Sequence, residues 1–403
     1  MTFSAIDHAH MARALRLAEL GLHTTQPNPR VGCVIARGEE VVGEGWHQRA
    51  GEPHAEVFAL RDAGERARGA TAYVTLEPCA HFGRTPPCAD ALIAAGVARV
   101  VAACEDPNPK VAGGGFAKVR AAGIAIDTGL LRDAARELNR GFFSRIERAR
   151  PWLRIKLAMS LDGRTALANG VSKWITGEAA RADVQRWRAR SSAIMTGSGT
   201  VLADNPRLTV RSTSLSLSPD VVGGQGWGER AMPEVASTQS TRLPLTQPSP
   251  PSQLGGEGFT PQRVVLDRSL RTPKDAHVLD GTVSTLVLHA SNATTQDDRY
   301  SRVELVPVAV DTDGQLDLPA ILRTLAERGI NELQVEAGPT LCGALFAQGL
   351  LDELLLYVAP VMLGDEARPL LTLPRIDEMA QGMRLRLVEQ RQVGADLRLL
   401  LRG

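Results

Sequence analysis

The feature that most constrains the fold of this chain is an alternation of strand-like and helix-like segments in its first 145 residues. A helix that Ser4 can cap begins the domain, and a β-hairpin is predicted at "VGCVIARGEEVVGEGWH", where two apolar runs meet at a polar turn. Helices are then predicted at 54–63, 88–95 and 116–122, and strands at 72–76, 99–104 and 124–129. Because strands that alternate with helices form layered domains, we expect an α/β domain over residues 1–145.

Residues 146–403 repeat this alternation, and 403 residues are too many for one typical core, so a second α/β domain is expected. Its predicted strands are 152–160, 193–197, 263–267, 285–290, 332–338 and 353–363, and its predicted helices are 177–189, 317–328 and 340–348. Residues 213–262 interrupt it with a composition rich in Ser, Pro, Gly and Gln. Such a segment buries too little apolar area to offset its ordering entropy, which predicts a mostly disordered insertion. A folded lid is the alternative.

Composition excludes several classes of function. Hydrophobic residues make up 43% and charged residues 23% of the chain, as in soluble globular proteins. A net charge of +1 offers no general nucleic-acid-binding surface, and there is no apolar run long enough to span a membrane. Five cysteines, an odd number, favour a reducing compartment and a metal site over a disulfide framework. The first residues lack the pattern of a signal peptide, so we expect a cytoplasmic protein.

Four side chains in two short segments have the chemistry of a catalytic zinc site. "HAEVFAL" supplies His54 and Glu56, and "EPCAHFGRTPPC" supplies Cys79 and Cys88. Pro53 is expected to start the first helix and Cys88 to open another, and a helix N-terminus favours thiolate. Catalytic zinc commonly takes three protein ligands and leaves a position for water. Zinc nucleobase deaminases use such an H-x-E…P-C-x-x-C arrangement with Glu as the proton carrier, although here eight residues separate the cysteines.

A closed structural zinc site is the alternative, and it needs a fourth ligand. The candidates by residue type are Cys33, Cys104, His47 and His81. Cys33 and Cys104 stand in apolar, strand-like runs that are typical of a core, and His47 is typical of a surface or hydrogen-bonded histidine. The H-x-E spacing is not that of structural fingers, and a closed site would leave Glu56 without a role.

Longer motifs resemble a known family. "TQPNPRVGCVI", "TLEPCAHFGRTPPC" and "DPNPKVAGGG" resemble the deaminase half of the bifunctional riboflavin-biosynthesis deaminase/reductase, and "KLAMSLDGRTA", "TGSGTVLADNPRLTVR" and "VEAGPTLCGALF" resemble its reductase half. The resemblance covers nearly the whole chain except 213–262. It implies a zinc cytidine-deaminase-like three-layer domain at 1–145 and a dihydrofolate-reductase-like domain at 146–403. It also implies one zinc ion per chain, NADPH, and a homodimer or higher homo-oligomer formed through the reductase domain.

The same resemblance implies the two reactions. The first half hydrolyses a ring amine of a diaminopyrimidinone that bears a ribosylamino 5′-phosphate, and the second reduces the ribosyl group to ribityl with NADPH. The residues that match the family's deaminase substrate contacts are Asn28, His81, Arg84, Asp106 and Asn108. The family usually has lysine in place of Arg84; arginine keeps the charge and adds a planar fork for phosphate oxygens, so function is expected to survive. For Asn28 and Asn108, which adjoin prolines, turn chemistry is the alternative role.

In the second half the residues themselves give a weaker signal. Gly338-Pro339-Thr340 lies between a predicted strand and helix, whose first N–H groups can hold a pyrophosphate, but a G-x-G-x-x-G fingerprint does not follow the first strand. The resemblance implies cofactor contacts at Ala158, Trp174, Thr200, Asp204, Gly338, Pro339, Thr340, Leu341, Cys342, Gly343 and Ala344. It implies substrate contacts at Ser172, Arg188, Leu208, Arg211 and Glu336. The proton donor is left open between Lys156 and water.

Two rival functions are weighed against this one. A zinc deaminase for nucleic acid or free nucleotides, fused to a reductase-like module, predicts a short cysteine loop and a basic strand-binding surface, and the sequence has neither. A non-enzymatic zinc-binding module is the other rival. The expected partners are therefore phosphorylated pyrimidine substrates, without nucleic acid or membrane.

Overall fold

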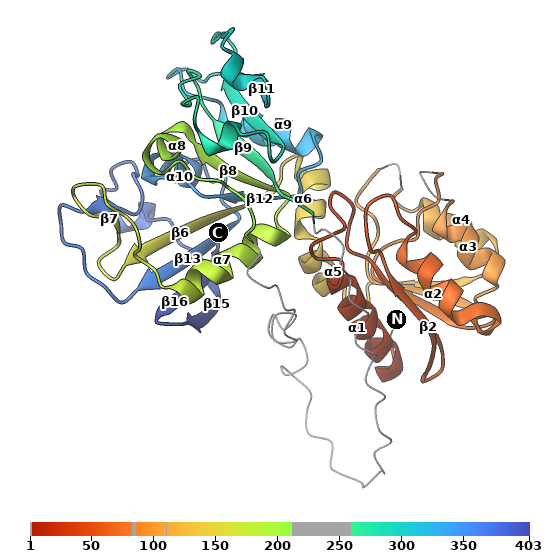
Figure 1. Cartoon of the computed structure of the whole chain (residues 1–403). Helices are drawn as coiled ribbons and strands as arrows, with labels where there is room; N and C mark the ends of the chain where they lie inside the picture. The colour runs from red at the N-terminus through yellow and green to blue at the C-terminus, as the bar shows by residue number, and fades with distance from the viewer. Residues whose placement is uncertain (1, 83–85, 110, 212–258) are drawn as a thin grey trace, which may run out of the picture.

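The N-terminal part of the chain, where strands and helices were predicted to alternate, forms a five-stranded sheet with helices on both faces (Figure 1). The computed structural model describes residues 2–82, 86–109, 111–211 and 259–403. The N-terminal domain contains α1 (Ala5–Glu19), β1 (Gly32–Arg37), β2 (Glu40–Trp46), α2 (Ala55–Ala63), η1 (Gly64–Ala67), β3 (Thr71–Val74), α3 (Cys88–Ala95), β4 (Arg99–Ala102), α4 (Gly114–Ala121), β5 (Ala125–Thr128) and α5 (Arg132–Leu138). The strand order is β2-β1-β3-β4-β5; β1 is antiparallel to both neighbours, and β3, β4 and β5 are parallel.

Two hydrophobic clusters, one on each face of this sheet, make the domain three-layered. Successive side chains of a strand point to opposite faces, so Cys33 and Ile35 pack with α2, α3 and α4 while Val34 packs with α1. Gly45 allows α2 to approach β2 closely, because an added Cβ would lie only 2.5 Å from the Cβ of Phe58. The predicted three-layer arrangement is therefore present, and it brings the first turns of α2 and α3 together.

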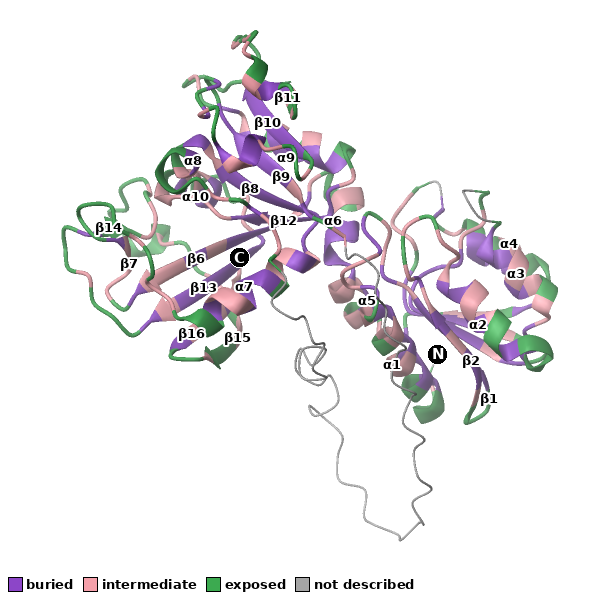
Figure 2. Cartoon of the chain, in the orientation of Figure 1, coloured by how far each residue is buried: buried purple, intermediate pink, exposed green. Residues whose placement is uncertain are grey.

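The C-terminal domain is built on a nine-stranded sheet that follows a connecting helix. Its elements are α6 (Arg140–Arg148), β6 (Trp152–Ser160), β7 (Arg164–Ala166), α7 (Glu178–Arg190), β8 (Ala193–Gly197), α8 (Ser198–Asp204), β9 (Gln262–Leu266), η3 (His277–Leu279), β10 (Thr285–Ala290), η4 (Asp298–Tyr300), β11 (Glu304–Val308), α9 (Leu318–Glu327), β12 (Glu332–Val335), α10 (Pro339–Ala347), β13 (Glu353–Ala359), β14 (Arg368–Pro369), η5 (Met379–Gln381), β15 (Arg386–Val393) and β16 (Asp396–Arg402). The strand order is β11-β10-β9-β8-β12-β6-β13-β16-β15. Its inner strands β12 and β10 are buried, whereas β15 at one edge is largely exposed (Figure 2).

Three details differ from the predictions. β9 begins at Gln262, so the predicted insertion 213–262 reaches one residue into a strand; its residues up to 258 lie outside the described part of the chain. Pro53 does not start α2, because His54 is the N-cap and Ala55 is the first helical residue. The elements that were not predicted include α5, α6, α8, β7, β11, β14 and the C-terminal hairpin of β15 and β16. Within the described residues, no helix has the length and hydropathy that crossing a membrane requires.

A buried network of charges joins the two domains. Glu332 at the start of β12 and Glu353 at the start of β13 are 1% and 0% exposed. Burial by itself would raise the pKa of Glu332, but surrounding arginines hold it well below its usual range. The arginines paired with these two carboxylates are Arg30, Arg140, Arg154, Arg190 and Arg402. Arg30 comes from the N-terminal domain, so part of the charge compensation in the core of the C-terminal domain crosses the domain boundary.

Candidate active sites

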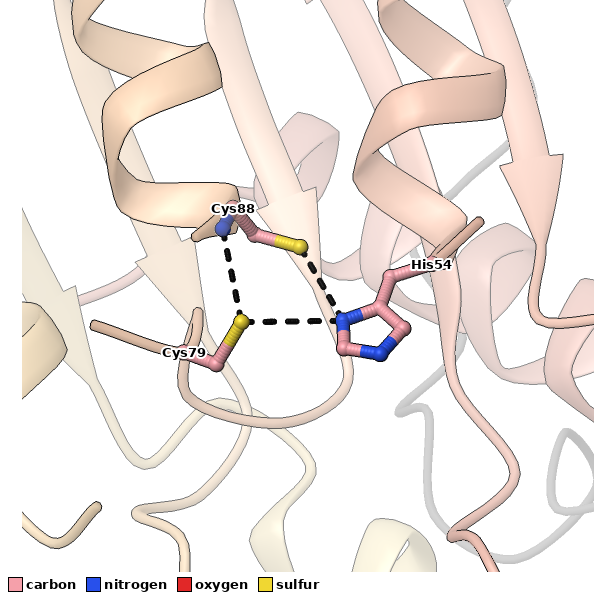
Figure 3. A group of neighbouring side chains, drawn as sticks. All are labelled: His54, Cys79 and Cys88. Carbon is pink, nitrogen blue, oxygen red and sulfur yellow. Dashed lines mark hydrogen bonds between the residues drawn. The ribbon is translucent and has the colours of Figure 1, made fainter. Parts of the chain in front are cut away.

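Three potential zinc ligands meet at the N-terminal ends of α2 and α3 (Figure 3). His54 is the N-cap of α2, Cys88 is the first residue of α3, as predicted, and Cys79 lies in the loop between β3 and α3. His54 Nδ1 lies 3.2 Å from Cys88 Sγ and 3.6 Å from Cys79 Sγ. The potential ligand atoms all lie within 4.8 Å of one another. Nitrogen and sulfur atoms gathered at this spacing form the donor set of a catalytic zinc site.

The electrostatics of the two cysteines also suit a divalent cation. The Cys88 side chain hydrogen-bonds with the Cys79 sulfur, and this contact, together with His54 and the Cys88 N–H at 3.3 Å, lowers the pKa of Cys79 to about 4. The pKa of Cys88 is raised in turn, because it shares its proton with Cys79 and is buried. Zinc binds cysteine as the thiolate, so a metal that binds both sulfur atoms displaces any proton that they share. The residues fit zinc.

Glu56, in the first turn of α2, is the carboxylate of this site and is only 3% exposed. Burial raises its pKa, and His54 opposes that shift. A raised pKa suits a group that takes up a proton and returns it during a reaction. Over the described ranges, His54, Cys79 and Cys88 are the one cluster that could hold a metal. The prediction that Cys33 and Cys104 are core residues is confirmed.

His47 supports the site instead of acting as a ligand. It is 3% exposed, and its ring stands edge-on to the ring of His54, with centroids 5.4 Å apart. Its Nε2 lies 3.1 Å from Asn28 Nδ2, and its Nδ1 lies 3.1 Å from the Pro53 carbonyl oxygen. Because an amide nitrogen only donates, Nε2 accepts from Asn28 and Nδ1 donates to Pro53. The one signal for this role in the sequence is a histidine seven residues before His54.

Three of the other predicted deaminase contacts lie around the same site. Asp106 is close enough to Cys79 and His81 for their charges to affect it, and burial raises the pKa of Asp106 to about 6. Its carboxylate accepts a hydrogen bond of 2.8 Å from the N–H of Asn108. His81 is exposed on the loop between the two cysteines. Arg84 falls outside the described residues.

Glu77, which the sequence reasoning missed, fastens the Asp106 loop to the cysteine loop. Its buried carboxylate accepts four backbone hydrogen bonds, from Asp106, Gly113, Gly115 and Phe116. Gly115 is required for this approach, since an added Cβ would lie 1.8 Å from the Pro78 carbonyl oxygen. The available signal was an acidic residue directly after the strand predicted at 72–76 and directly before Pro78 and Cys79.

The second site is a cavity of about 1460 Å³ in the C-terminal domain. This exceeds the ~300–1,000 Å³ of a pocket for one small molecule and accommodates two ligands. The predicted residues that line it are Ala158, Ser172, Trp174, Arg188, Thr200, Asp204, Leu208, Arg211, Glu336, Gly338, Pro339, Thr340, Leu341 and Ala344. Two predicted residues do not line it: Cys342 is fully buried in the core, and Gly343 packs against the backbone of Thr372. Leu341 and Ala344 are three residues apart, so they share the face of α10 that lines the cavity. Cys342 and Gly343 lie between them and belong to the face that points into the core.

One wall of the cavity is a fixed polar pair. Arg188 binds Glu336 through two hydrogen bonds of 2.7 Å and donates a third, of 2.9 Å, to the Thr209 carbonyl oxygen. Lys156 on β6 lies in the same wall, and burial lowers its pKa. Arg268 and Arg271, which were not predicted, also line the cavity and follow β9 in the sequence. The available signal for these two arginines was their position just after the predicted strand 263–267, which ends at the cavity.

Comparisons with known proteins agree with both sites. Residues 4–104 match the cytidine and deoxycytidylate deaminase zinc-binding region, and residues 151–399 match the RibD C-terminal domain. The chain is 47% identical over 397 residues to the riboflavin biosynthesis protein RibD of Escherichia coli (strain K12), covering 98% of this chain and 99% of that protein. Its fold is similar to that of Acinetobacter baumannii RibD, with a TM-score of 0.82, 41% identity and 98% of each chain covered.

Fold and site together define a zinc-dependent deaminase domain joined to a reductase domain. The chain belongs to the RibD family of riboflavin biosynthesis proteins. It is a bifunctional deaminase and reductase, with a zinc site in its first domain and NADPH as the cofactor of its second. The rival of a nucleic-acid or free-nucleotide deaminase fused to a reductase-like module is not favoured.

Proposed function

We propose that the chain deaminates a diaminopyrimidinone bearing a ribosylamino 5′-phosphate and then reduces the ribosyl group of the product. A relative from Thermotoga maritima, 29% identical with a TM-score of 0.78 and 98% of each chain covered, is described as a diaminohydroxyphosphoribosylaminopyrimidine deaminase and 5-amino-6-(5-phosphoribosylamino)uracil reductase. The observation that carries the proposal is the buried Glu56 beside the His54, Cys79 and Cys88 donors, in one chain with a cavity for two ligands. The substrates are small phosphorylated pyrimidines, and nucleic acid is not required.

In the first reaction Glu56 moves the protons. Bound zinc supplies the Lewis acidity that activates a water molecule. Glu56 accepts a proton from that water and delivers one to the ring amine, so that a C–O bond forms, the C–N bond breaks and ammonia leaves. Asn28, Asp106 and Asn108 hold the pyrimidine, and the loop with His81 and Arg84 holds the phosphate.

In the second reaction the protein orients two ligands. NADPH supplies the hydride. The N-terminus of α10 faces the cavity at Gly338, where backbone N–H groups suit a pyrophosphate. The pair of Arg188 and Glu336 orients the sugar, and Arg211 provides positive charge for its phosphate.

We propose Lys156 as the proton donor for the reduction. A lysine whose pKa is lowered by burial gives up its proton more readily near neutral pH. Replacing Lys156→Met keeps the length of the side chain and removes the proton. We expect kcat of the reductase to fall by roughly 10²-fold while the dissociation constant of NADPH stays the same. An unchanged kcat would assign the proton to water.

Ultraviolet difference spectra with the diaminopyrimidinone nucleotide test the whole proposal. Without NADPH we expect only the spectral change of deamination, and with NADPH we expect nicotinamide absorbance to fall afterwards. Oxidation of NADPH by the substrate before deamination would contradict the order of the two steps, and no change in either cuvette would contradict the substrate.

We further propose that two chains associate through the reductase domain in the cytoplasm. The exposed edge strand β15 and several exposed apolar side chains of the same domain support this proposal, among them Met362 at 67% and Met379 at 86% exposure. Such side chains are typical of interfaces when they gather on one domain. All five cysteines are free, as zinc binding by thiolates in a reducing compartment requires. Light scattering that gives the mass of a monomer would contradict the dimer.

A further inference from the structure

We infer that the reductase domain positions the substrate-binding loop of the deaminase domain, residues 25–30, and that Asn331 and Ser192 are positioning residues for deamination. The inference rests on the proposed function, because it takes Asn28 in this loop as a substrate contact. It concerns side chains of the reductase domain that lie outside both sites.

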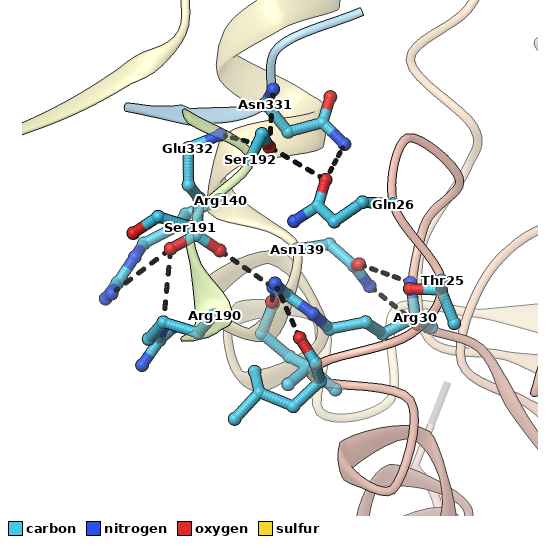
Figure 4. A network of polar contacts seen from close by, with 12 residues as sticks. Thr25, Gln26, Arg30, Asn139, Arg140, Arg190, Ser191, Ser192, Asn331 and Glu332 are labelled. Carbon is cyan, nitrogen blue, oxygen red and sulfur yellow. Dashed lines mark hydrogen bonds and ion pairs between the residues drawn. The ribbon is translucent and has the colours of Figure 1, made fainter. Parts of the chain in front are cut away.

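Asn331 and Ser192 hold the first part of the loop (Figure 4). The Nδ2 group of Asn331 donates to Gln26 Oε1 at 2.9 Å and to the Pro27 carbonyl oxygen at 2.8 Å. The hydroxyl of Ser192 donates to the same Gln26 Oε1 at 2.9 Å. Asn331 is fixed in turn, since its Oδ1 accepts from Arg145 Nε at 2.6 Å. Gln26, Ser192 and Asn331 are all buried, so water does not replace these bonds.

The end of the loop is held by a second set of contacts. Arg30 Nη1 lies 2.9 Å from Glu332 Oε1, within the buried charge network. The backbone N–H and carbonyl of Arg30 both bind the side chain of Asn139, at 2.8 Å each. Between these two anchors, the N–H of Asn28 closes a turn onto the Thr25 carbonyl oxygen at 2.8 Å. Asn28 is therefore placed by contacts on both sides of it.

From Asn28 the contacts continue to the metal ligands. Asn28 donates to His47, and His47 donates to the carbonyl oxygen of Pro53, the residue before His54. The reductase domain thus reaches the deaminase site through hydrogen bonds that the backbone of the 25–30 loop links together, from Asn331 to the start of α2. Small displacements of a substrate-binding group weaken binding steeply, so this support sets the affinity for substrate.

Loss of the cross-domain contacts is expected to disturb the deaminase site and to leave the reductase site unchanged. Asn331 precedes β12, which ends near Glu336 in the reductase cavity. β12 is paired along its length with β6 on one side and β8 on the other, so the sheet fixes Glu336 whether or not Gln26 is bound. The loop that carries Asn28 has no such sheet pairing and depends on the cross-domain contacts.

Two substitutions, Gln26→Ala and Asn331→Ala, test the inference in the zinc-loaded full chain. Gln26→Ala removes two hydrogen bonds and Asn331→Ala removes three, so we expect the KM of deamination to rise about three- to tenfold. The kcat of deamination, the zinc content and both constants of the reductase stay unchanged. The double variant should resemble the more impaired single variant, because both changes break the same contact. Faster hydrogen exchange at the amide of Asn28 is expected in each.

Arg148→Ala is the matched control. It removes the 2.8 Å contact between Arg148 Nη1 and Asp352 Oδ1, a link from the connecting helix to the sheet that does not touch the 25–30 loop, and should leave the KM of deamination unchanged. Asn28→Ala tests the proposed substrate contact itself. If Asn28→Ala raises KM while Gln26→Ala and Asn331→Ala do not, the inference fails and the proposed function stands. If Asn28→Ala has no effect, the substrate contact fails and the inference fails with it. Equal losses in both activities would show a general structural role instead. Where Asn331→Ala does not fold, Gln26→Ala decides alone.

Discussion

A Glu56→Gln protein is expected to keep its zinc and to lose deamination by about 10²- to 10⁴-fold. The amide has the size of the carboxylate, and the three ligands His54, Cys79 and Cys88 are untouched, so the metal site remains. What is lost is the group that accepts a proton from water and passes one to the leaving amine. The measurement is the rate of ammonia release, with zinc content determined on the same sample.

Two comparisons make this result specific. Glu65→Gln, at an exposed position in the same domain, should deaminate at the rate of the unchanged protein. Reduction of the already deaminated substrate should also proceed normally in Glu56→Gln, because the reductase cavity lies in the other domain. Near-normal deamination by zinc-loaded Glu56→Gln would rule out the proton-carrying role.

The metal site was accessible to sequence reasoning because its signals are local. His54 and Cys88 each stand at a helix start that the surrounding pattern predicts, and helix N-termini suit thiolates and metal ligands whatever the rest of the fold does. The family resemblance then added Asp106 and Asn108, whose placement depends on Glu77. That carboxylate acts through backbone N–H groups, 29 to 39 residues away in sequence, and residue identity does not reveal such contacts.

The domain interface was not accessible in the same way. Arg30 and Glu332 are separated by 302 residues, and each by itself is a typical surface residue. Only the packing of one domain against the other shows that both are buried and paired. Cys342 and Gly343 do not line the cavity for a different reason: the motif was transferred as a continuous run, whereas a helix presents only some of its residues to a cavity. The hairpin of β15 and β16 was missed because β15 is exposed along most of its length and gives a weak apolar pattern.

The second large effect expected is a clean separation of the two chemistries within one folded chain. All zinc ligands and Glu56 lie before residue 145, and the proposed NADPH contacts line a cavity in the C-terminal domain. Removing zinc with a chelator, or replacing Cys88→Ser, should therefore abolish deamination. The same protein should still reduce the deaminated ribosylamino-uracil phosphate with NADPH. The contacts by which the reductase domain holds residues 25–30 are compatible with this result. They position a loop of the deaminase domain and are not needed to form the reductase cavity.

The reciprocal change is Gly338→Val at the start of α10. Gly338 has φ −74° and ψ 175°, which valine also adopts, and an added Cβ would meet only Thr200 Oγ1, at 3.9 Å. The new side chain therefore disturbs the approach of the cofactor pyrophosphate to the backbone rather than the fold. Loss of one or two hydrogen bonds costs about 1–3 kcal/mol, which raises the dissociation constant of NADPH roughly 10- to 100-fold. Deamination should continue at its normal rate.

Gly343→Val provides the contrast for that experiment. An added Cβ there would lie 2.0 Å from the Thr372 carbonyl oxygen, so this variant should lose stability, which Gly338→Val should not. NADPH binding by fluorescence titration, thermal unfolding and two activity assays, one for each substrate, distinguish the two glycines. If folded, zinc-free protein lost reduction as well as deamination, zinc would have to support the whole assembly, and the independence of the two catalytic sites would be wrong. If it retained reduction, the reductase domain would work without the metal, and the two catalytic sites would be chemically independent.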